Sequence, residues 1–470
     1  MKRSSAQKSA LPLALMLAAV AVTLGVVRVV TAERASAPQA RSSPEAVTQP
    51  APPTPDPVPR RLGITTHPSG AAVTITAPDG STRAATAPFA GTLAGGNLEL
   101  RVSLDGYNPL AQRVTLDRDR DLDLWLDPEG LLHHKVGELT TGSNPKQVAF
   151  SPDGRQLWVT LLGGKGVEVF DARTLERLAQ ITLGAHGSVE VIFSGDGSTA
   201  YVSQMETASV FEIDRKALTV RRQLPTKGVW SKVMALSPDE RTLYVANWSS
   251  NDVSEIDLGT GMVRRLLATV RTPRGLFATP DGRQLFVAGF SDGQLERIDL
   301  ASGHSETLLD TGGALRHLVG DPRRGVVYAD DMAKSAAYVV DLRSGQPRKL
   351  AATNAKPNTI DLTPDGKVLY VSNRGENGRS FSMPGPEWGS VLAIDTTTGK
   401  VLDAIMGGNQ TTGLDVSGDG RLLAFSDFLD NRVQIFAIPP LEALANGGGG
   451  RASAHLAEIP KRRVDSRPGR

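Results

Sequence analysis

The sequence predicts an all-β protein dominated by a seven-bladed β-propeller. A ten-residue motif, Ser/Thr-Pro-Asp-Gly followed by an apolar run, recurs with variations from positions 151, 194, 237, 279, 321, 363 and 417. The first five intervals are 42 or 43 residues and the sixth is 54. Several short strands per repeat at such a period indicate one four-stranded blade for each repeat.

Each repeat supplies the elements of a blade. In the motif Pro presets φ and Gly tolerates the final turn position, so the motif predicts a turn between two strands. The strand after the turn is apolar and β-branched or aromatic, as in Leu243-Tyr244-Val245, and the strand before it is exemplified by Gly275–Ala278. A third strand ends in Asp at positions 171, 214, 257, 299, 341 and 395, where the carboxylate is expected to bind nearby backbone N–H groups.

The repeats resemble a known family. The segments starting at Tyr201, Tyr244 and Tyr370 are Tyr-Val-Ser-Gln, Tyr-Val-Ala-Asn and Tyr-Val-Ser-Asn, and they resemble the YVTN repeat of bacterial seven-bladed propellers. That family is similar to the lactonase-type propellers, and the resemblance covers residues 133–440. The fifth and seventh repeats are degenerate. The resemblance implies the fold, but a shared activity does not follow from a shared fold.

The last repeat offers only three strands before Pro439-Pro440. The segment Lys135–Thr140 precedes the first turn and resembles the fourth strand of other repeats. We predict that it completes the seventh blade, which would join the two ends of the propeller and leave no open sheet edge.

The N-terminus sets the expected compartment. Lys2, Arg3 and Lys8 precede an uncharged apolar run, residues 11–27, so residues 1–32 are either a signal peptide cleaved after Ala32 or a membrane anchor. Either alternative predicts an exported protein, periplasmic or extracellular, held at the inner membrane if the segment is uncleaved. Residues 33–61 are rich in Pro and Ala and are expected to be an extended spacer.

A second module is predicted at residues 62–128. Its expected strands are 62–66, 72–76, 98–104, 112–116 and 122–125, and the alternation over 98–102 indicates one buried face. Pro68-Ser69-Gly70-Ala71 and Gly106-Tyr107 resemble the PEGA domain, a small β-sandwich of bacterial envelope proteins. The resemblance implies an accessory binding or scaffolding role. Residues 441–470 are expected to form a disordered basic tail.

The motifs of common enzymes are missing from the sequence. The chain has no Cys, which excludes disulfides, thiolate chemistry and covalent c-type haem. It contains no nucleophile elbow, zinc-protease helix or P-loop, and neighbouring side chains of an extended strand, such as His133 and His134, point to opposite faces. We therefore expect no metal, cofactor or catalytic residue. The net charge of +2 argues against nucleic acid as a partner.

Two features differ among the repeats and indicate where a ligand could bind. Five residues before each turn, where the innermost strand begins, four of the seven repeats place a cation: Lys146, Lys232, Arg274 and Arg316. The other three have Val189, Asn358 and Thr412. The long sixth interval places an insertion at residues 374–389, whose polar and aromatic side chains suit a partner: Arg374, Arg379, Phe381 and Trp388. The alternatives are that the cations serve as structural partners of carboxylates such as Asp330 and Asp331, and that the insertion is disordered.

Two functions remain open at this stage. The favoured one is a non-enzymatic binding or scaffold protein of the cell envelope, whose propeller face engages a protein, a glycan or another anionic ligand. The alternative, implied by the lactonase-type resemblance, is hydrolysis of a small lactone or ester at the channel mouth. That activity would need a general base or metal-binding side chains, for which the plausibly placed residues are Asn247, Asp331, Asn373 and Asp427.

Overall fold

The computed structural model describes residues 58–67, 69–126, 129, 132–376 and 378–447. The predicted signal or anchor at 1–32, most of the spacer and the last part of the predicted tail lie outside these residues. Among the described residues, no helix is long and apolar enough to cross a membrane.

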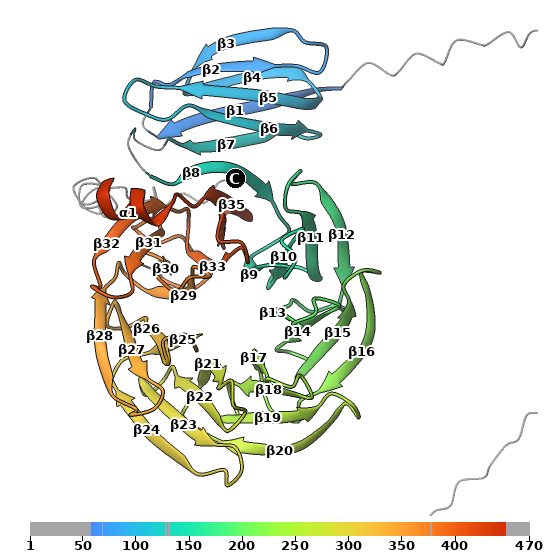
Figure 1. Ribbon diagram of the computed structural model, residues 1–470. Helices are drawn as coiled ribbons and strands as arrows, with labels where there is room; N and C mark the ends of the chain where they lie inside the picture. The colour runs from blue at the N-terminus through green and yellow to red at the C-terminus, as the bar shows by residue number, and fades with distance from the viewer. Residues whose placement is uncertain (1–57, 68, 127–128, 130–131, 377, 448–470) are drawn as a thin grey trace, which may run out of the picture. The chain divides into compact units, whose positions relative to one another are not determined.

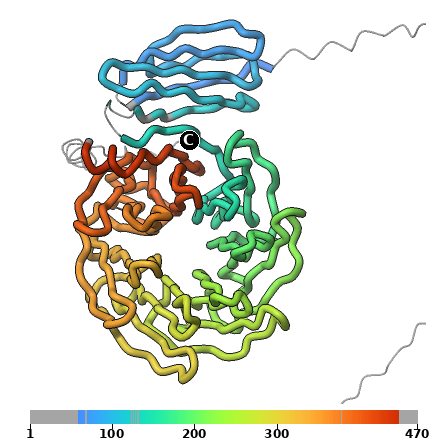
Figure 2. The backbone as a smooth tube through the Cα atoms, viewed as in Figure 1, coloured from blue at the N-terminus to red at the C-terminus, as the bar shows by residue number. Residues whose placement is uncertain are grey.

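Seven four-stranded antiparallel sheets form the predicted propeller (Figure 1). The strands of the first four blades are β9 (Pro145–Phe150), β10 (Gln156–Leu161), β11 (Gly166–Asp171), β12 (Arg177–Thr182), β13 (Val191–Phe193), β14 (Thr199–Gln204), β15 (Ser209–Asp214), β16 (Thr219–Pro225), β17 (Ser231–Leu236), β18 (Thr242–Asn247), β19 (Asp252–Asp257), β20 (Met262–Ala268), β21 (Pro273–Ala278), β22 (Gln284–Gly289), β23 (Gln294–Asp299) and β24 (Ser305–Asp310). Those of the last three are β25 (Leu315–Asp321), β26 (Val326–Asp331), β27 (Ala336–Asp341), β28 (Pro347–Ala352), β29 (Pro357–Leu362), β30 (Val368–Asn373), β31 (Ser390–Asp395), β32 (Val401–Met406), β33 (Thr411–Val416), β34 (Leu422–Asp427), β35 (Arg432–Ala437) and β8 (His134–Thr140). The first strand of each blade lies innermost, around the centre of the ring (Figure 2).

The predicted closure of the ring is confirmed. Strand β8 pairs antiparallel with β35 and supplies the outermost strand of the seventh blade, with Leu139 opposite Val433. Leu139 is buried in a cluster that also contains Val148 of the first blade. The seventh blade therefore combines three C-terminal strands, β33 to β35, with the N-terminal strand β8, which closes the ring.

The repeated polar residues hold the turns, as their pattern predicts. In the first blade Ser151 Oγ donates to Asp153 Oδ1 at 2.6 Å and accepts from the Gln156 N–H at 3.0 Å. The strand-ending carboxylates act similarly, since Asp171 Oδ1 accepts from the N–H of Thr174 at 2.7 Å. The apolar side chains between these turns form clusters that each draw on two adjacent blades, so the core lies between the sheets.

The N-terminal module has seven strands in two sheets. The first sheet has the order β4 (Phe89–Ala94), β1 (Pro59–His67), β7 (Arg120–Trp125), and the second has β3 (Thr82–Thr86), β2 (Ala72–Thr76), β5 (Gly96–Ser103), β6 (Leu110–Leu116). Alternating side chains of β2 and β5, including Val73, Ile75, Leu98 and Leu100, form its core. The sequence missed β3 and β4, because small and polar residues give those strands no clear apolar alternation.

The prediction of a disordered tail from residue 441 is wrong for its first residues. Leu441–Gly447 form the short helix α1. Leu444 is 1% exposed and packs in the cluster that contains Leu402, Ile405 and Phe436 of the last two blades. Packing of Leu444 and Leu441 against the propeller explains why this segment is helical. The prediction of disorder relied on the Gly-rich composition that follows and overlooked these two leucines.

Candidate functional site

Five basic side chains gather where the inner strands begin. Lys146, Lys232, Arg274 and Arg316 are each the second residue of an inner strand, on β9, β17, β21 and β25. Since these strands run in the same direction along the channel, their first residues meet at one end of it. Arg374, which directly follows β30, joins them, and its charge acts on Lys146 and Arg316. We call these five residues the channel cations.

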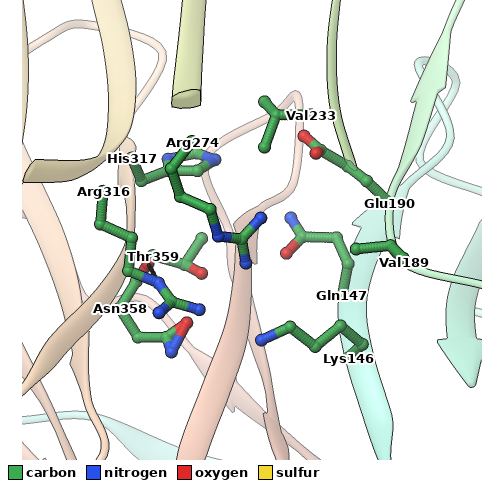
Figure 3. A pocket seen from close by; sticks show the side chains of 10 residues that line it. All are labelled: Lys146, Gln147, Val189, Glu190, Val233, Arg274, Arg316, His317, Asn358 and Thr359. Atoms are coloured by element: carbon green, nitrogen blue, oxygen red, sulfur yellow. Dashed lines mark hydrogen bonds between the residues drawn. The ribbon is translucent and has the colours of Figure 1, made fainter. Parts of the chain in front are cut away.

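Three of the channel cations, Lys146, Arg274 and Arg316, line a small cavity (Figure 3). The space between its walls is about 290 Å³ including open solvent, but only about 20 Å³ is free for the centre of a water molecule. That room suits a water or one small polar group. The lining residues come from six blades: Lys146, Gln147, Val189, Glu190, Val233, Arg274, Arg316, His317, Asn358 and Thr359.

Four of the five channel cations are buried, and none of the five forms an ion pair with a described residue. Lys146, Arg274, Arg316 and Arg374 are between 3% and 8% exposed. Among the described residues none of the five has a carboxylate oxygen within 4.0 Å. The contacts that they do make are to uncharged groups: Lys232 Nζ lies 3.6 Å from the centroid of the Trp248 ring, and Arg316 Nε donates to the Asn358 carbonyl at 2.9 Å.

Burial and mutual repulsion disfavour these charges. They lower the pKa of Lys232 to about 6, with burial as the larger cause and Arg274 and Arg316 as the next, so that Lys232 is largely uncharged at neutral pH until an anion favours its protonated form. The pKa of Lys146 is lowered well below its usual range for the same reasons. Because a guanidinium keeps its proton in proteins, the arginines cannot relieve the repulsion by titrating. A bound anion would relieve it.

Two carboxyl groups lie near the cations without pairing with them. Burial raises the pKa of Glu190 to about 8, so it is largely uncharged at neutral pH. Burial also raises the pKa of Asp330 to about 6, and its Oδ1 accepts from the backbone N–H of His317 at 2.6 Å. Neither Asp330 nor Asp331 forms an ion pair with a channel cation, and the charge of Asp330 acts on Arg274 and Arg316 only through space, where it partly offsets their burial.

Other polar groups at the channel also lack partners. Neither the oxygen nor the nitrogen of the Asn358 side chain, which is 2% exposed, makes a hydrogen bond to a described residue. The same holds for Arg374 Nε and His317 Nδ1. Buried polar groups are normally hydrogen-bonded, so this concentration of unpartnered polar atoms near the channel points to a bound group.

The insertion in the sixth blade folds over this end of the channel. Gln410, just before β33, donates through Nε2 to the Phe381 carbonyl at 2.9 Å and accepts from Arg374 through Oε1. The Phe381 ring packs on Phe428, with centroids 5.0 Å apart, and covers the Arg374 guanidinium. These contacts argue against a disordered insertion. The two other residues of the insertion that were predicted to bind a ligand, Arg379 and Trp388, differ from each other in exposure. Arg379 is exposed, whereas Trp388 is 7% exposed and contributes little to the surface.

The residues considered for hydrolysis are engaged in the fold. Asn247, Asp331, Asn373 and Asp427 each end the second strand of a blade and are 0% exposed. Asp331 Oδ1 accepts from the backbone N–H groups of Ala314 and Ala333, both at 2.9 Å. Asp427 accepts from Arg432 and Gln434, both at 2.7 Å. Among the described residues no three His, Asp or Glu side chains are grouped to hold a metal ion.

Comparisons with known proteins agree with this architecture. Residues 124–280 match the family model described as Lactonase, 7-bladed beta-propeller, and residues 60–128 match the PEGA domain. These matches confirm that the repeats resemble lactonase-type seven-bladed propellers and that the N-terminal module resembles a PEGA domain. Hydrazine synthase of Kuenenia stuttgartiensis has a similar fold, with a TM-score of 0.56 and 19% identity over 64% of this chain and 97% of that chain.

A curated relative matches a shorter segment. Antigen Lp49 of Leptospira interrogans serogroup Icterohaemorrhagiae serovar copenhageni is 52% identical over 83 residues. The match spans 17% of this chain and 18% of the antigen.

Proposed function

We propose that this chain is a non-enzymatic, exported binding protein whose propeller holds an anionic ligand at the end of the channel where the inner strands begin. The observation that carries the proposal is the group of five channel cations, four of them buried and Lys232 half-buried, without an ion-paired carboxylate among the described residues. A cleft lined by one sign of charge concentrates ligands of the other sign, and guanidinium groups suit carboxylate or phosphate oxygens.

The envelope location is part of the proposal. The apolar run at 11–27 after three basic residues supports export, with attachment to the membrane if the run is retained. The printed name of the relative, an antigen, is compatible with a protein presented outside the cytoplasm. The PEGA domain, as an accessory module, would provide a second contact with an envelope component.

The test is a triple substitution, Lys232→Gln with Arg274→Gln and Arg316→Gln, in the full chain. Binding of acetate and inorganic phosphate is measured by calorimetry across a range of salt concentrations. The unmodified protein should bind with an affinity that falls as salt rises, and the variant should bind far more weakly with little salt dependence. The matched control changes three exposed cations, Lys216, Arg283 and Arg421, to Gln.

A loss of fold in the triple variant would mean that the cations are structural. If burial of unpartnered charge destabilises the protein, as we propose, the variant should instead melt at the same or a higher temperature. Unchanged anion binding together with marked destabilisation would refute the proposal.

Hydrolysis remains a second candidate, because the lactonase-type family model matches residues 124–280. The channel carboxyl groups of Glu190 and Asp330 are the positions from which a general base could act, since burial raises the pKa of both. A panel of lactones and esters, assayed with and without Glu190→Gln, decides between the candidates. Turnover that Glu190→Gln abolishes would establish the enzyme instead of the binding protein.

A further inference from the structure

We infer that the ligand is a peptide segment of a partner protein, with a carboxylate that enters the channel and apolar residues that contact the rim. This inference rests on the proposed function, since it names the molecule that carries the anion. It depends on three features: the size of the cavity, the chemistry of the rim and the position of the rim residues around the ring.

The cavity admits only a small anionic group. About 20 Å³ is free for the centre of a water molecule between the channel cations. A carboxylate on a narrow side chain fits such a space with little adjustment, whereas a sugar ring would have to displace several side chains. The anion therefore enters the channel while the remainder of the ligand stays outside, against the rim.

Two loops at this end of the channel expose apolar side chains. Val229, Trp230, Phe381 and Met383 are between 44% and 50% exposed, and together we call them the apolar rim. Exposed apolar side chains beside arginines are characteristic of protein interfaces. The valine and methionine carry no group that could bind sugar hydroxyls, and a free inorganic anion would not touch the rim. This composition favours a peptide over a glycan.

The rim residues are held in place by the fold. Trp230 has a φ of 62°, a conformation that bulky residues rarely adopt, and its carbonyl accepts from the Trp248 N–H at 3.0 Å. The Val229 carbonyl accepts from Ser249 at 3.0 Å. On the other side, Gln410 Nε2 donates to the carbonyls of Phe381 and Met383. The same positive φ and the same carbonyl hydrogen bond recur before the inner strands of four other blades, at Asn144, Thr272, Lys356 and Gln410, so the propeller repeat itself fixes the position of Trp230.

The two halves of the apolar rim lie on opposite sides of the channel. Val229 and Trp230 precede β17 of the third blade, and Phe381 and Met383 belong to the insertion of the sixth. A chain crossing this end of the propeller would therefore contact one pair before the channel and the other pair after it. Its carboxylate would lie between them, above Arg274 and Arg316. A peptide with a central acidic residue and apolar residues on both sides of it would make all of these contacts.

The experiment uses the full chain and synthetic probes. The main probe is a short acetylated and amidated peptide with a central Glu flanked by Leu residues. Comparison peptides replace the Glu by Gln, replace the flanks by Ser, or keep the flanks and end in a free C-terminal carboxylate. Acetate, inorganic phosphate and oligogalacturonate represent the bare anions and an acidic sugar. Affinities come from calorimetry.

The rim variant combines Trp230→Gly, which suits the φ of that position, with Met383→Ser. Its matched control combines Leu178→Ser with Met262→Ser, two residues that are 49% and 58% exposed on outer strands. We expect the Leu-flanked Glu peptide to bind at least about tenfold more tightly than the Gln and Ser peptides, and the rim variant to lose about tenfold. Because Trp230 lies against Lys232, with Nζ 5.7 Å from its ring centroid, the test of bare anions uses Val229→Ser with Met383→Ser, in which acetate and phosphate binding should not change.

The remaining outcomes distinguish failure of the peptide inference from failure of the proposed anion-binding function. If the free C-terminal carboxylate binds best, the peptide inference holds and the source of the carboxylate is a chain end. If acetate or phosphate binds but no peptide binds more tightly, or if oligogalacturonate exceeds every peptide, the peptide inference fails and the anion-binding function stands. If no probe binds, both fail.

Discussion

Replacing Lys232 by Met should stabilise the propeller, and by an amount that depends on pH. Burial and the neighbouring arginines lower the pKa of Lys232 to about 6 in the folded protein, whereas an unfolded chain has the ordinary lysine value of about 10.4. Folding therefore releases a proton between these two values. The destabilisation is complete below the folded pKa and disappears as pH rises towards the unfolded pKa.

The magnitude follows from proton linkage. In the interval between the two pKa values, the cost of folding changes by about 1.4 kcal/mol for each pH unit. The benefit of Lys232→Met should therefore be about 3 kcal/mol larger at pH 7 than at pH 9. The contact between the ammonium and the Trp248 ring favours the charged form, which raises the pH at which the slope begins but leaves its steepness unchanged.

Urea unfolding followed by tryptophan fluorescence measures the difference at the two pH values. Lys216→Met is the control, because Lys216 is exposed and should give the same small effect at both. If Lys232→Met changes the free energy of unfolding equally at pH 7 and pH 9, Lys232 is not the strained cation that the channel geometry implies. The argument for an unsatisfied anion site would then lose one of its main supports.

Three further predictions concern the fold. Leu139→Ala, in the strand that closes the ring, should lower the free energy of unfolding by about 2–5 kcal/mol, and deletion of residues 133–141 should destabilise the propeller further; unchanged melting would refute a role in closure. Asp361 and Asp415 share a hydrogen bond on neighbouring inner strands. Burial raises the pKa of both, and the charge of Asp361 raises that of Asp415 further, so stability falls as pH rises through about 6 and Asp415→Asn should stabilise the protein at pH 8 but not at pH 4. Calorimetry should show two transitions, each reproduced by the isolated PEGA module or propeller, and a single transition with insoluble fragments would show that the domain boundary is wrong.

The sequence predicts the propeller well because its information is repeated. Seven turns at a nearly constant interval determine the number of blades, and the absence of a fourth strand in the last repeat identifies Lys135–Thr140 as the closing strand. Single features without a repeat were harder to predict. His133 lies between the Asp403 carboxylate, 2.6 Å from Nδ1, and the Tyr370 hydroxyl, 2.8 Å from Nε2, and these partners are more than two hundred residues away in the chain.

The same reasoning explains which parts of the site were found. Comparing one position across the repeats identified four channel cations, and the insertion length identified Arg374. Glu190 and His317 occupy the next position along the inner strands, and Asp330 lies on a second strand, so a comparison confined to one position missed them. A comparison of the next position in each repeat could have identified Glu190 and His317. The absence of ion pairs, however, depends on three-dimensional distances that no spacing reveals.

The repeats also show that the fold itself does not require a cation at the channel end. Val189, Asn358 and Thr412 occupy the equivalent position in three blades. Strands β29 and β33 begin one residue before Asn358 and Thr412, as the cation-bearing strands do, whereas β13 begins at Val191. Neutral side chains there would avoid the repulsion that lowers the pKa of Lys146 and Lys232. Four blades nevertheless place a cation at this position, and Arg374 adds a fifth charge from a second strand. Because the propeller geometry does not need these charges and their burial opposes folding, the proposed anion would supply the gain that offsets them.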